Sequence, residues 1–234
     1  RGMEKLCYVL WKPAAIGGDA FRDRLLAEVA PPLLAGPARG LSLLVADGEA
    51  ERLARARISR MEEPVAGMLS IWLERASERA AIEAALAPHA ARFAGYLVAE
   101  SVPLPNTTQR VAPGARTPGT TMLALLEKPE RLDFAQWIAL WHDSHSPLAM
   151  EIQCTFRYVR NVVVRALTPE APPWRGLVEE AFPTEAVTDL ARWYDAVGNP
   201  EKLRERVGRM VASVQRFLDL DRVESHPLGE YVLR

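Results

Sequence analysis

Two short stretches decide the fold: LCYVLWKP at residues 6–13 and MLALLEKP at residues 122–129. Both are apolar runs that end in Lys-Pro, and their ends are separated by 129 − 13 = 116 residues. Short apolar runs that stop at a proline are typical of buried β-strands. The recurrence of the pattern at this distance predicts that the chain contains the same structural unit twice.

The same order of elements follows each of these strands: a helix, two strands, a second helix and a closing strand. In the first half we expect these elements at residues 19–30, 41–46, 67–73, 76–92 and 96–99. In the second half we expect them at residues 133–146, 158–164, 176–182, 184–217 and 230–233. The order β-α-β-β-α-β is that of a ferredoxin-like unit.

Between the halves lies the stretch PLPNTTQRVAPGARTPGTT, residues 103–121, with four prolines and two glycines. Such a composition without apolar periodicity is typical of a linker. We therefore expect one ferredoxin-like unit at residues 3–102 and a second at residues 122–234.

The strands at 6–10 and 122–126 are apolar at every position, so both of their faces must be covered. Helices can cover one face. The best cover for the other face is the sheet of the second unit, which predicts an α+β fold with two antiparallel sheets closed into a barrel. Side chains on the inner face would then fill the barrel or line a cavity in it.

Composition narrows the class of protein. With 29 basic and 30 acidic residues the net charge is −1. The sequence contains no dense stripe of basic residues, so we expect no nucleic-acid partner. No apolar run reaches the roughly 18 residues that span a bilayer, so we expect no membrane partner. Only Cys7 and Cys154 are present, and no signal peptide is evident, which favours a cytoplasmic protein without disulfides.

One helix carries two histidines, within LDFAQWIALWHDSHSPLAM at residues 132–150. Asp133 and Gln136 have the spacing of a capping box at its start. Pro147 disfavours helical backbone at Ser146, so we expect the helix to end there.

Trp137, Trp141 and His145 are four residues apart and therefore share the face that packs on the sheet. A buried histidine needs a hydrogen-bond partner. One interpretation is a core histidine bonded to a backbone carbonyl; another is an acid–base or ligand-orienting group in a cavity. A third interpretation is a metal ion bound by His145 together with His142, which lies at the edge of this face. No further ligand is evident nearby in the sequence, so we predict no metal.

The second half resembles the EthD domain family. The resemblance is carried by Phe134-x-x-Trp137-x-x-x-Trp141-x-x-x-His145-x-Pro147-Leu148, then Tyr158-x-x-Asn161, then Gly176-x-x-Glu179-x-x-Phe182, then His226-Pro227-x-x-x-Tyr231. It covers residues 122–234, whereas the first half fits only by its order of elements. It implies the dimeric α+β barrel superfamily, whose members include polyketide cyclases and dehydratases, lactone isomerases and haem-handling enzymes. It also allows a homodimer.

The resemblance implies a site with His145, Tyr158 and Glu179 as catalytic residues. It also singles out Asn161. We predict ligand contacts from Trp137, Trp141, His142 and Asn161.

Residues alternate across a strand, so Tyr158 and Asn161 should point to opposite faces, as should Glu179 and Glu180. In the first half Ala30 stands in the place of His145 and Ser70 in that of Glu179. We therefore expect one site per chain.

From these residues we predict a cofactor-free lyase or isomerase that acts on a small apolar or aromatic carbonyl compound bound in the barrel. Dehydration, cyclisation or a proton shift would fit a histidine that titrates near neutral pH. Two alternatives remain: a non-catalytic binding or accessory protein with the same cavity, and a haem- or oxygen-handling oxidase with His145 as iron ligand or base. Nucleotide-binding and serine-hydrolase signatures are absent.

Overall fold

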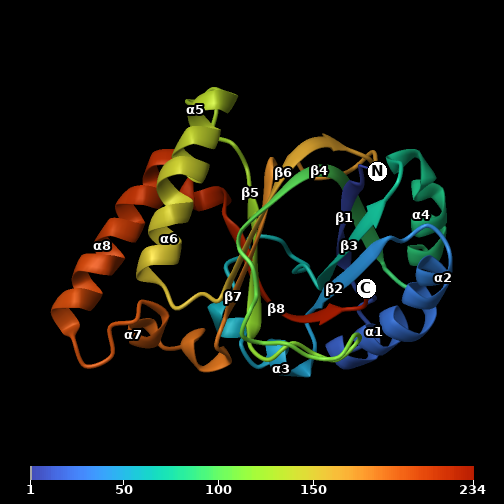
Figure 1. The fold of residues 1–234 in the computed structure, drawn as a ribbon, viewed down its shortest axis with the longest axis horizontal. Helices are drawn as coiled ribbons and strands as arrows, with labels where there is room; N and C mark the ends of the chain where they lie inside the picture. Colours follow the sequence, from blue (N-terminus) through green and yellow to red (C-terminus); the bar gives the residue numbers. More distant parts are fainter. Residues whose placement is uncertain (1) are drawn as a thin grey trace.

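A closed antiparallel barrel of eight strands forms the centre of the protein in a computed structural model that describes residues 2–234 (Figure 1). Around the barrel the strands follow the order β1-β3-β2-β8-β5-β7-β6-β4. The strands are β1 (Glu4–Trp11), β2 (Gly40–Val45), β3 (Gly67–Leu73), β4 (Arg92–Leu104), β5 (Thr120–Leu126), β6 (Arg157–Ala166), β7 (Gly176–Phe182) and β8 (Glu224–Val232).

Each half of the chain supplies four neighbouring strands, in the order β4-β1-β3-β2 from the first half and β8-β5-β7-β6 from the second. Both orders place the first strand of the half between its third and its fourth. The pairs β2–β8 and β4–β6 join the two sheets and close the barrel. The predicted α+β barrel of two antiparallel sheets is therefore confirmed.

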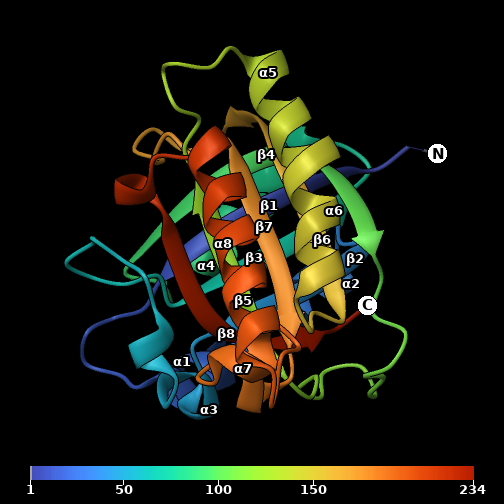
Figure 2. The same cartoon turned by 90° about the vertical axis from the view of Figure 1, so that its left-hand side faces the viewer.

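Helices cover the outside of the barrel on two opposite sides (Figures 1 and 2). The first half contributes α1 (Gly18–Arg24), η1 (Leu25–Val29), α2 (Ala30–Ala35), η3 (Ala76–Arg79) and α4 (Ala80–Leu86). The second half contributes α5 (Phe134–Ile138), η4 (Ala139–His145), α6 (Ser146–Ile152), α7 (Leu190–Trp193) and α8 (Pro200–Phe217). Short turns complete the chain: α3 (Gly48–Glu51), η2 (Ala54–Ala56), η5 (Thr184–Ala186) and η6 (Leu220–Arg222). Within residues 2–234 no helix is both long enough and apolar enough to cross a membrane.

The histidine helix does not end at Ser146 as predicted. It continues to Ile152. The segment η4 has π-helical hydrogen bonds, and α6 follows it with Pro147 in its first turn. A proline is tolerated there because the first turn of a helix does not need the backbone N–H that proline lacks. The Ser146 hydroxyl also donates to the carbonyl of Trp141, at 2.9 Å. In the first half η1 is likewise a π segment followed by prolines at the start of α2.

Two other predicted helices are shorter than expected. The stretch 76–92 is helical only to Leu86, and the stretch 184–217 is broken until Asn199 caps α8 and Pro200 starts it. Gly198, just before the cap, has φ +73, a left-handed conformation that glycine adopts without strain. Strands β4 and β8 are longer than predicted, because in a closed barrel each pairs on both edges.

Apolar side chains fill the middle of the barrel. They form one buried cluster with members from both halves: Cys7, Val9, Trp11, Leu44, Ala46, Val65, Met68, Ala94, Tyr96, Val98, Leu123, Leu125, Val163, Trp174, Leu177 and Leu228. Two further clusters lie between the helices and the outer face of the sheet, one in each half. The apolar runs at 6–10 and 122–126 therefore contribute to a cluster on each side of the sheet, as their composition required.

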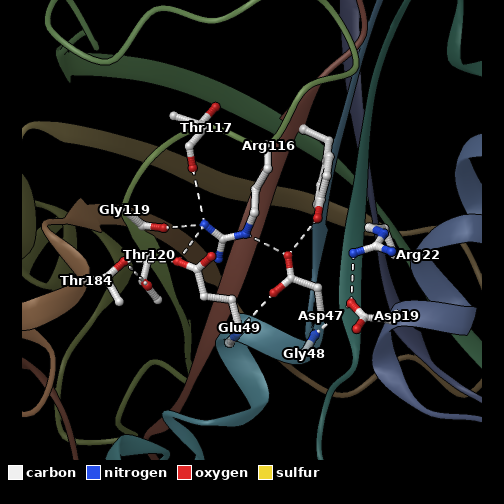
Figure 3. A network of polar contacts seen from close by, with 12 residues as sticks. Asp19, Arg22, Asp47, Gly48, Glu49, Arg116, Thr117, Gly119, Thr120 and Thr184 are labelled. Atoms are coloured by element: carbon white, nitrogen blue, oxygen red, sulfur yellow. Dashed lines mark hydrogen bonds and ion pairs between the residues drawn. The ribbon is translucent and has the colours of Figure 1, made fainter.

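The segment between β4 and β5 is fastened to the barrel by Arg116 (Figure 3). Its Nε donates to Asp47 Oδ2 at 2.8 Å, and its Nη1 donates to the carbonyl of Gly119 at 2.9 Å. Asp47 is buried and also accepts a hydrogen bond from Tyr231 Oη at 2.6 Å. Burial opposes ionisation of Asp47, but the bonds from Arg116 and Tyr231 outweigh it and lower the pKa of this carboxyl.

Replacing Arg116→Ala is expected to lower the free energy of unfolding by about 2–4 kcal/mol, because it leaves a buried carboxylate without its cation. Urea unfolding of both proteins at neutral pH measures the loss. The matched control is Arg209→Ala, which removes an exposed arginine paired with Glu151 and Glu205 and should change stability by about 0–1 kcal/mol. Equal effects of the two substitutions would contradict the fastening role of Arg116.

Candidate functional site

A cavity of about 330 Å³ lies between the helices of the second half and the outer face of its sheet. It is outside the barrel, whereas the sequence led us to expect a site inside it. The helices above it are η4 and α8, and the strands below it are β5, β6, β7 and β8. The lining residues are Ile58, Ala124, Leu126, Trp141, His145, Gln153, Tyr158, Val178, Glu180, Trp193, Met210, Val211, Val214, Phe217, Leu218, Leu220, Val223 and Ser225.

His145 reaches this cavity from η4 and is 8% exposed. Its Nδ1 lies 3.0 Å from the hydroxyl oxygen of Ser213 on α8, and its ring packs against Phe217 with centroids 4.7 Å apart. The hydrogen-bond partner is therefore a side-chain hydroxyl rather than a backbone carbonyl. Nε2 has no hydrogen-bond partner within residues 2–234. Burial lowers the pKa of His145 to about 4, so the ring is neutral at pH 7.

Glu180 on β7 is the one charged side chain among the lining residues. No cation pairs with it in the described part of the chain, and apolar side chains such as Val178 and Met210 surround the cavity. Burial raises the pKa of Glu180 to about 7, and a hydrogen bond with Tyr158 opposes this rise only in part. A carboxyl with this pKa is half ionised near neutral pH and can accept or donate a proton.

Tyr158 on β6 stands beside Glu180 and is 1% exposed. The Ser146 hydroxyl lies 3.4 Å from Tyr158 Oη, so the phenol is held from the helix side as well. Burial raises the pKa of Tyr158 further above its ordinary value, so the phenol keeps its proton at neutral pH. The neutral phenol can therefore act as a hydrogen-bond donor.

Trp141 forms one wall of the cavity, with Trp137 packed behind it at a centroid distance of 5.0 Å. The rings lie over Gly176, where a Cβ would be 2.7 Å from Cη2 of Trp141. Glycine at this position therefore permits the close approach of the helix to the sheet. Of the predicted ligand contacts, Trp141 lines the cavity, whereas Trp137 and His142 are not among the lining residues. The carbonyl of His142 accepts a bond from Arg160, at 3.2 Å.

Glu179 and Asn161 do not belong to this site, although both were expected to share it with His145. They point into the barrel, where Glu179 accepts hydrogen bonds from Arg157 Nη2 at 2.8 Å and from Asn161 Nδ2 at 3.0 Å. Burial would raise the pKa of Glu179, but Lys5 and Arg157 lower it to about 2. The alternation expected for Glu179 and Glu180 is thus present, and it assigns the two carboxyls to different compartments.

The sequence reasoning placed one of Glu179 and Glu180 at the cavity but chose Glu179, and it missed Ser213. The signal for Glu180 was present, because a second carboxyl in an otherwise apolar strand must face the side opposite to Glu179. Ser213 gave no signal, since it is separated from His145 by 68 residues and joins it only when α8 packs beside η4. The described residues contain no group of three or more His, Cys, Asp or Glu side chains placed to hold a metal ion.

Comparison with solved structures shows that other proteins share this α+β barrel fold. An anthrone oxidase-like protein matches with a TM-score of 0.56 and 10% identity, over 99% of this chain and 93% of that one. A proposed monooxygenase from Fusobacterium nucleatum subsp. nucleatum matches with a TM-score of 0.50 and 6% identity, over 99% and 92%. A mutant chlorite dismutase from Candidatus Nitrospira defluvii, in complex with cyanide, matches with a TM-score of 0.50 and 9% identity, over 97% of this chain and 90% of that one.

No protein-family model matches the chain, and no curated protein matches its sequence. At identities of 6 to 10% these neighbours show a shared fold and nothing about the reaction. The resemblance of the second half to the EthD family stays a prediction.

Replacing Glu180→Gln should make stability less dependent on pH between about 4.5 and 7. The folded protein holds a proton on Glu180 through this range while the unfolded chain releases it, so wild-type stability falls as pH rises, by at most about 1.4 kcal/mol per pH unit. Urea unfolding at several pH values from 5 to 8 measures this slope. The exposed carboxyl of Glu151 gives the control, Glu151→Gln, whose profile should follow the wild type; a Glu180→Gln profile parallel to both would contradict the raised pKa.

Proposed function

We propose that the protein is an enzyme that binds a small, largely apolar carbonyl compound in the cavity beside His145 and moves a proton on the carbon next to the carbonyl. The observation that carries this proposal is the half-buried Glu180, the one charged lining residue, in the same cavity as a neutral Tyr158 and a neutral His145. A base near its own pKa at neutral pH and adjacent uncharged donors are what proton abstraction from a carbon acid requires.

The proposed step uses these three side chains in different roles. The Glu180 carboxylate takes the proton as the C–H bond breaks, and the electron pair moves to the carbonyl oxygen to give an enolate. Tyr158 or Nε2–H of His145 donates a hydrogen bond to that oxygen. The Ser213 hydroxyl favours this tautomer when it donates to Nδ1, because the ring proton is then on Nε2. Return of the proton from Glu180 to another carbon gives an isomerase. In a dehydratase the enolate electron pair forms the C=C bond as the β C–O bond breaks, and the proton on Glu180 is transferred to the departing hydroxyl, which leaves as water.

The walls of the cavity set the class of substrate. Trp141, Val178, Met210 and Phe217 offer apolar and aromatic surface, and a volume of about 330 Å³ lies at the small end of ligand pockets. A flat compound of one to three rings with a single carbonyl suits this space. An anionic substrate does not suit it, because none of the described residues that line the cavity is a lysine or arginine and the ionised Glu180 would repel an anion.

Haem fits these residues poorly. His145 has a free Nε2 for iron, but the space beside it is about 330 Å³ and no lining side chain carries the positive charge that would pair with the haem carboxylates. The residues present thus favour proton transfer by the chain's own groups over a haem-handling oxidase.

Replacing Glu180→Gln should lower proton transfer by about 100-fold or more, the usual contribution of a general base, with little change in binding. The probe is 2-tetralone in D₂O, and NMR follows exchange of its hydrogens next to the carbonyl. The control Glu151→Gln should exchange the probe at the wild-type rate. Binding of the probe without exchange in the wild type would instead support the non-catalytic binding protein.

The pH dependence gives an independent test of the base. Exchange catalysed by the wild type, corrected for the solvent rate, should rise with pH and level off above about 7, because only ionised Glu180 accepts the proton. His145→Ala should retain this profile with a lower plateau, since His145 is already neutral above about pH 4. A profile whose midpoint moves in His145→Ala would assign the titrating group to histidine and contradict the role of Glu180.

A further inference from the structure

A second cavity, of about 400 Å³, lies at one mouth of the barrel. It is formed by the ends of β2, β3, β6 and β8 together with the segment between β4 and β5. The lining residues are Ser42, Trp72, Asn106, Gln109, Arg110, Val111, Thr117, Arg157, Glu230, Val232 and Arg234. None of them lines the cavity beside His145, so the two spaces are separate.

Arg157 lies at the inner end of this cavity, and one nitrogen of its guanidinium makes an ion pair without an aligned hydrogen bond. Nη2 donates to Glu179 at 2.8 Å. Nη1 lies 3.2 Å from Oε1 of Glu230 but is not aligned for a hydrogen bond, and within residues 2–234 it has no hydrogen-bond acceptor. Burial would lower the pKa of Arg157, but the nearby carboxylates of Glu179 and Glu230 have the larger effect and raise it. The guanidinium is therefore charged at neutral pH. A buried guanidinium N–H without an aligned acceptor is rare. The hydrogen-bonding capacity of Arg157 is therefore not fully satisfied by Glu179 and Glu230.

The groups behind Arg157 hold it in this position. Lys5, 4% exposed, lies 2.5 Å from Glu100 and 3.4 Å from Glu179, and its ammonium group is 4.6 Å from the ring centre of Trp72. Burying this many charges costs several kcal/mol per ion before pairing compensates. Retaining them at the mouth of an otherwise apolar barrel is expected where they orient a ligand-binding group.

Arg110 supplies a second cation at the rim. It is exposed and makes no hydrogen bond or ion pair with the described residues. Its segment is nevertheless ordered, because Asn106 Oδ1 accepts from the amide of Gln109 at 2.9 Å and Arg116 fastens the segment to Asp47 (Figure 3). Arg234, by contrast, is already bonded to the carbonyls of Leu34 and Ala38.

We propose that this barrel mouth is a second binding site, for a small organic acid. Its carboxylate would pair with the guanidinium of Arg157, which lines the cavity, and with Arg110; guanidinium groups are the planar donors best matched to a carboxylate. Its apolar part would lie on the wall made by Trp72, Val111 and Val232. The single acidic lining residue, Glu230, is already offset by Arg157.

The second site and the proposed reaction site lie on opposite faces of the same sheet. Arg157 precedes Tyr158 on β6, and Glu179 precedes Glu180 on β7, so each ligand-binding or supporting residue inside has a reaction-site neighbour outside. The binding proposal itself does not depend on the proposed function, because its probe and its variants concern the barrel mouth alone.

Calorimetric titration with benzoate, and with the uncharged benzamide as the matched probe, tests the site on the full chain. We expect saturable binding of benzoate, binding of benzamide weaker by about tenfold or more, and weaker benzoate binding at high salt. Arg110→Gln should weaken benzoate binding about tenfold, while the control Arg24→Gln, at an exposed arginine on α1, should leave it unchanged.

Arg157→Lys keeps a positive charge beside Glu179 and should still lose the benzoate interaction, because one ammonium cannot replace the two-pronged donor. Circular dichroism checks that this variant is folded, and Arg110→Gln keeps the test valid if it is not. Equal binding of benzoate and benzamide, no saturable benzoate binding, or an affinity unchanged in Arg110→Gln would each overturn the proposal. None of these outcomes bears on proton exchange by Glu180.

Discussion

The alternation of side chains across β6 and β7 is the constraint on which the rest of this protein depends. These two strands form one wall of a closed barrel, with helices on the other side, so successive residues enter different environments. Glu179 and Arg157 point into the barrel, whereas Glu180 and Tyr158 point into the helix-covered cavity. A shift of one residue in the register of either strand would exchange the two sets.

Two adjacent carboxyls consequently have opposite chemistry. Burial disfavours the charge of both carboxyls. Glu179 meets Lys5 and Arg157, and its pKa falls to about 2; Glu180 meets no cation among residues 2–234, and its pKa rises to about 7. The first therefore serves as a fixed negative charge in an ion-pair network. The second is left able to exchange a proton at neutral pH, in a cavity lined mainly by apolar side chains.

The two halves share their strand order and differ in how the helices meet the sheet. In the first half Phe21, Leu25 and Leu33 pack with Leu69 and Ile71 into a filled layer. In the second half Trp137 and Trp141 pack over Gly176 at one end of the sheet, and a cavity is left beside His145. Both halves have a π segment before a proline, but only the second places a histidine at its end. The two halves thus differ in side-chain packing on a shared order of strands.

The sequence by itself determined the order of elements, the closed barrel and the helix face that buries His145, because periodicity and fully apolar strands are local properties of the chain. It also determined that Glu179 and Glu180 face opposite sides. Only the tertiary structure decided which side is hollow, that Ser213 is the partner of His145, and that Arg157 and Lys5 neutralise Glu179. These three features depend on contacts between residues that are far apart in the chain. A local sequence pattern does not show which distant side chains pack together or form ion pairs.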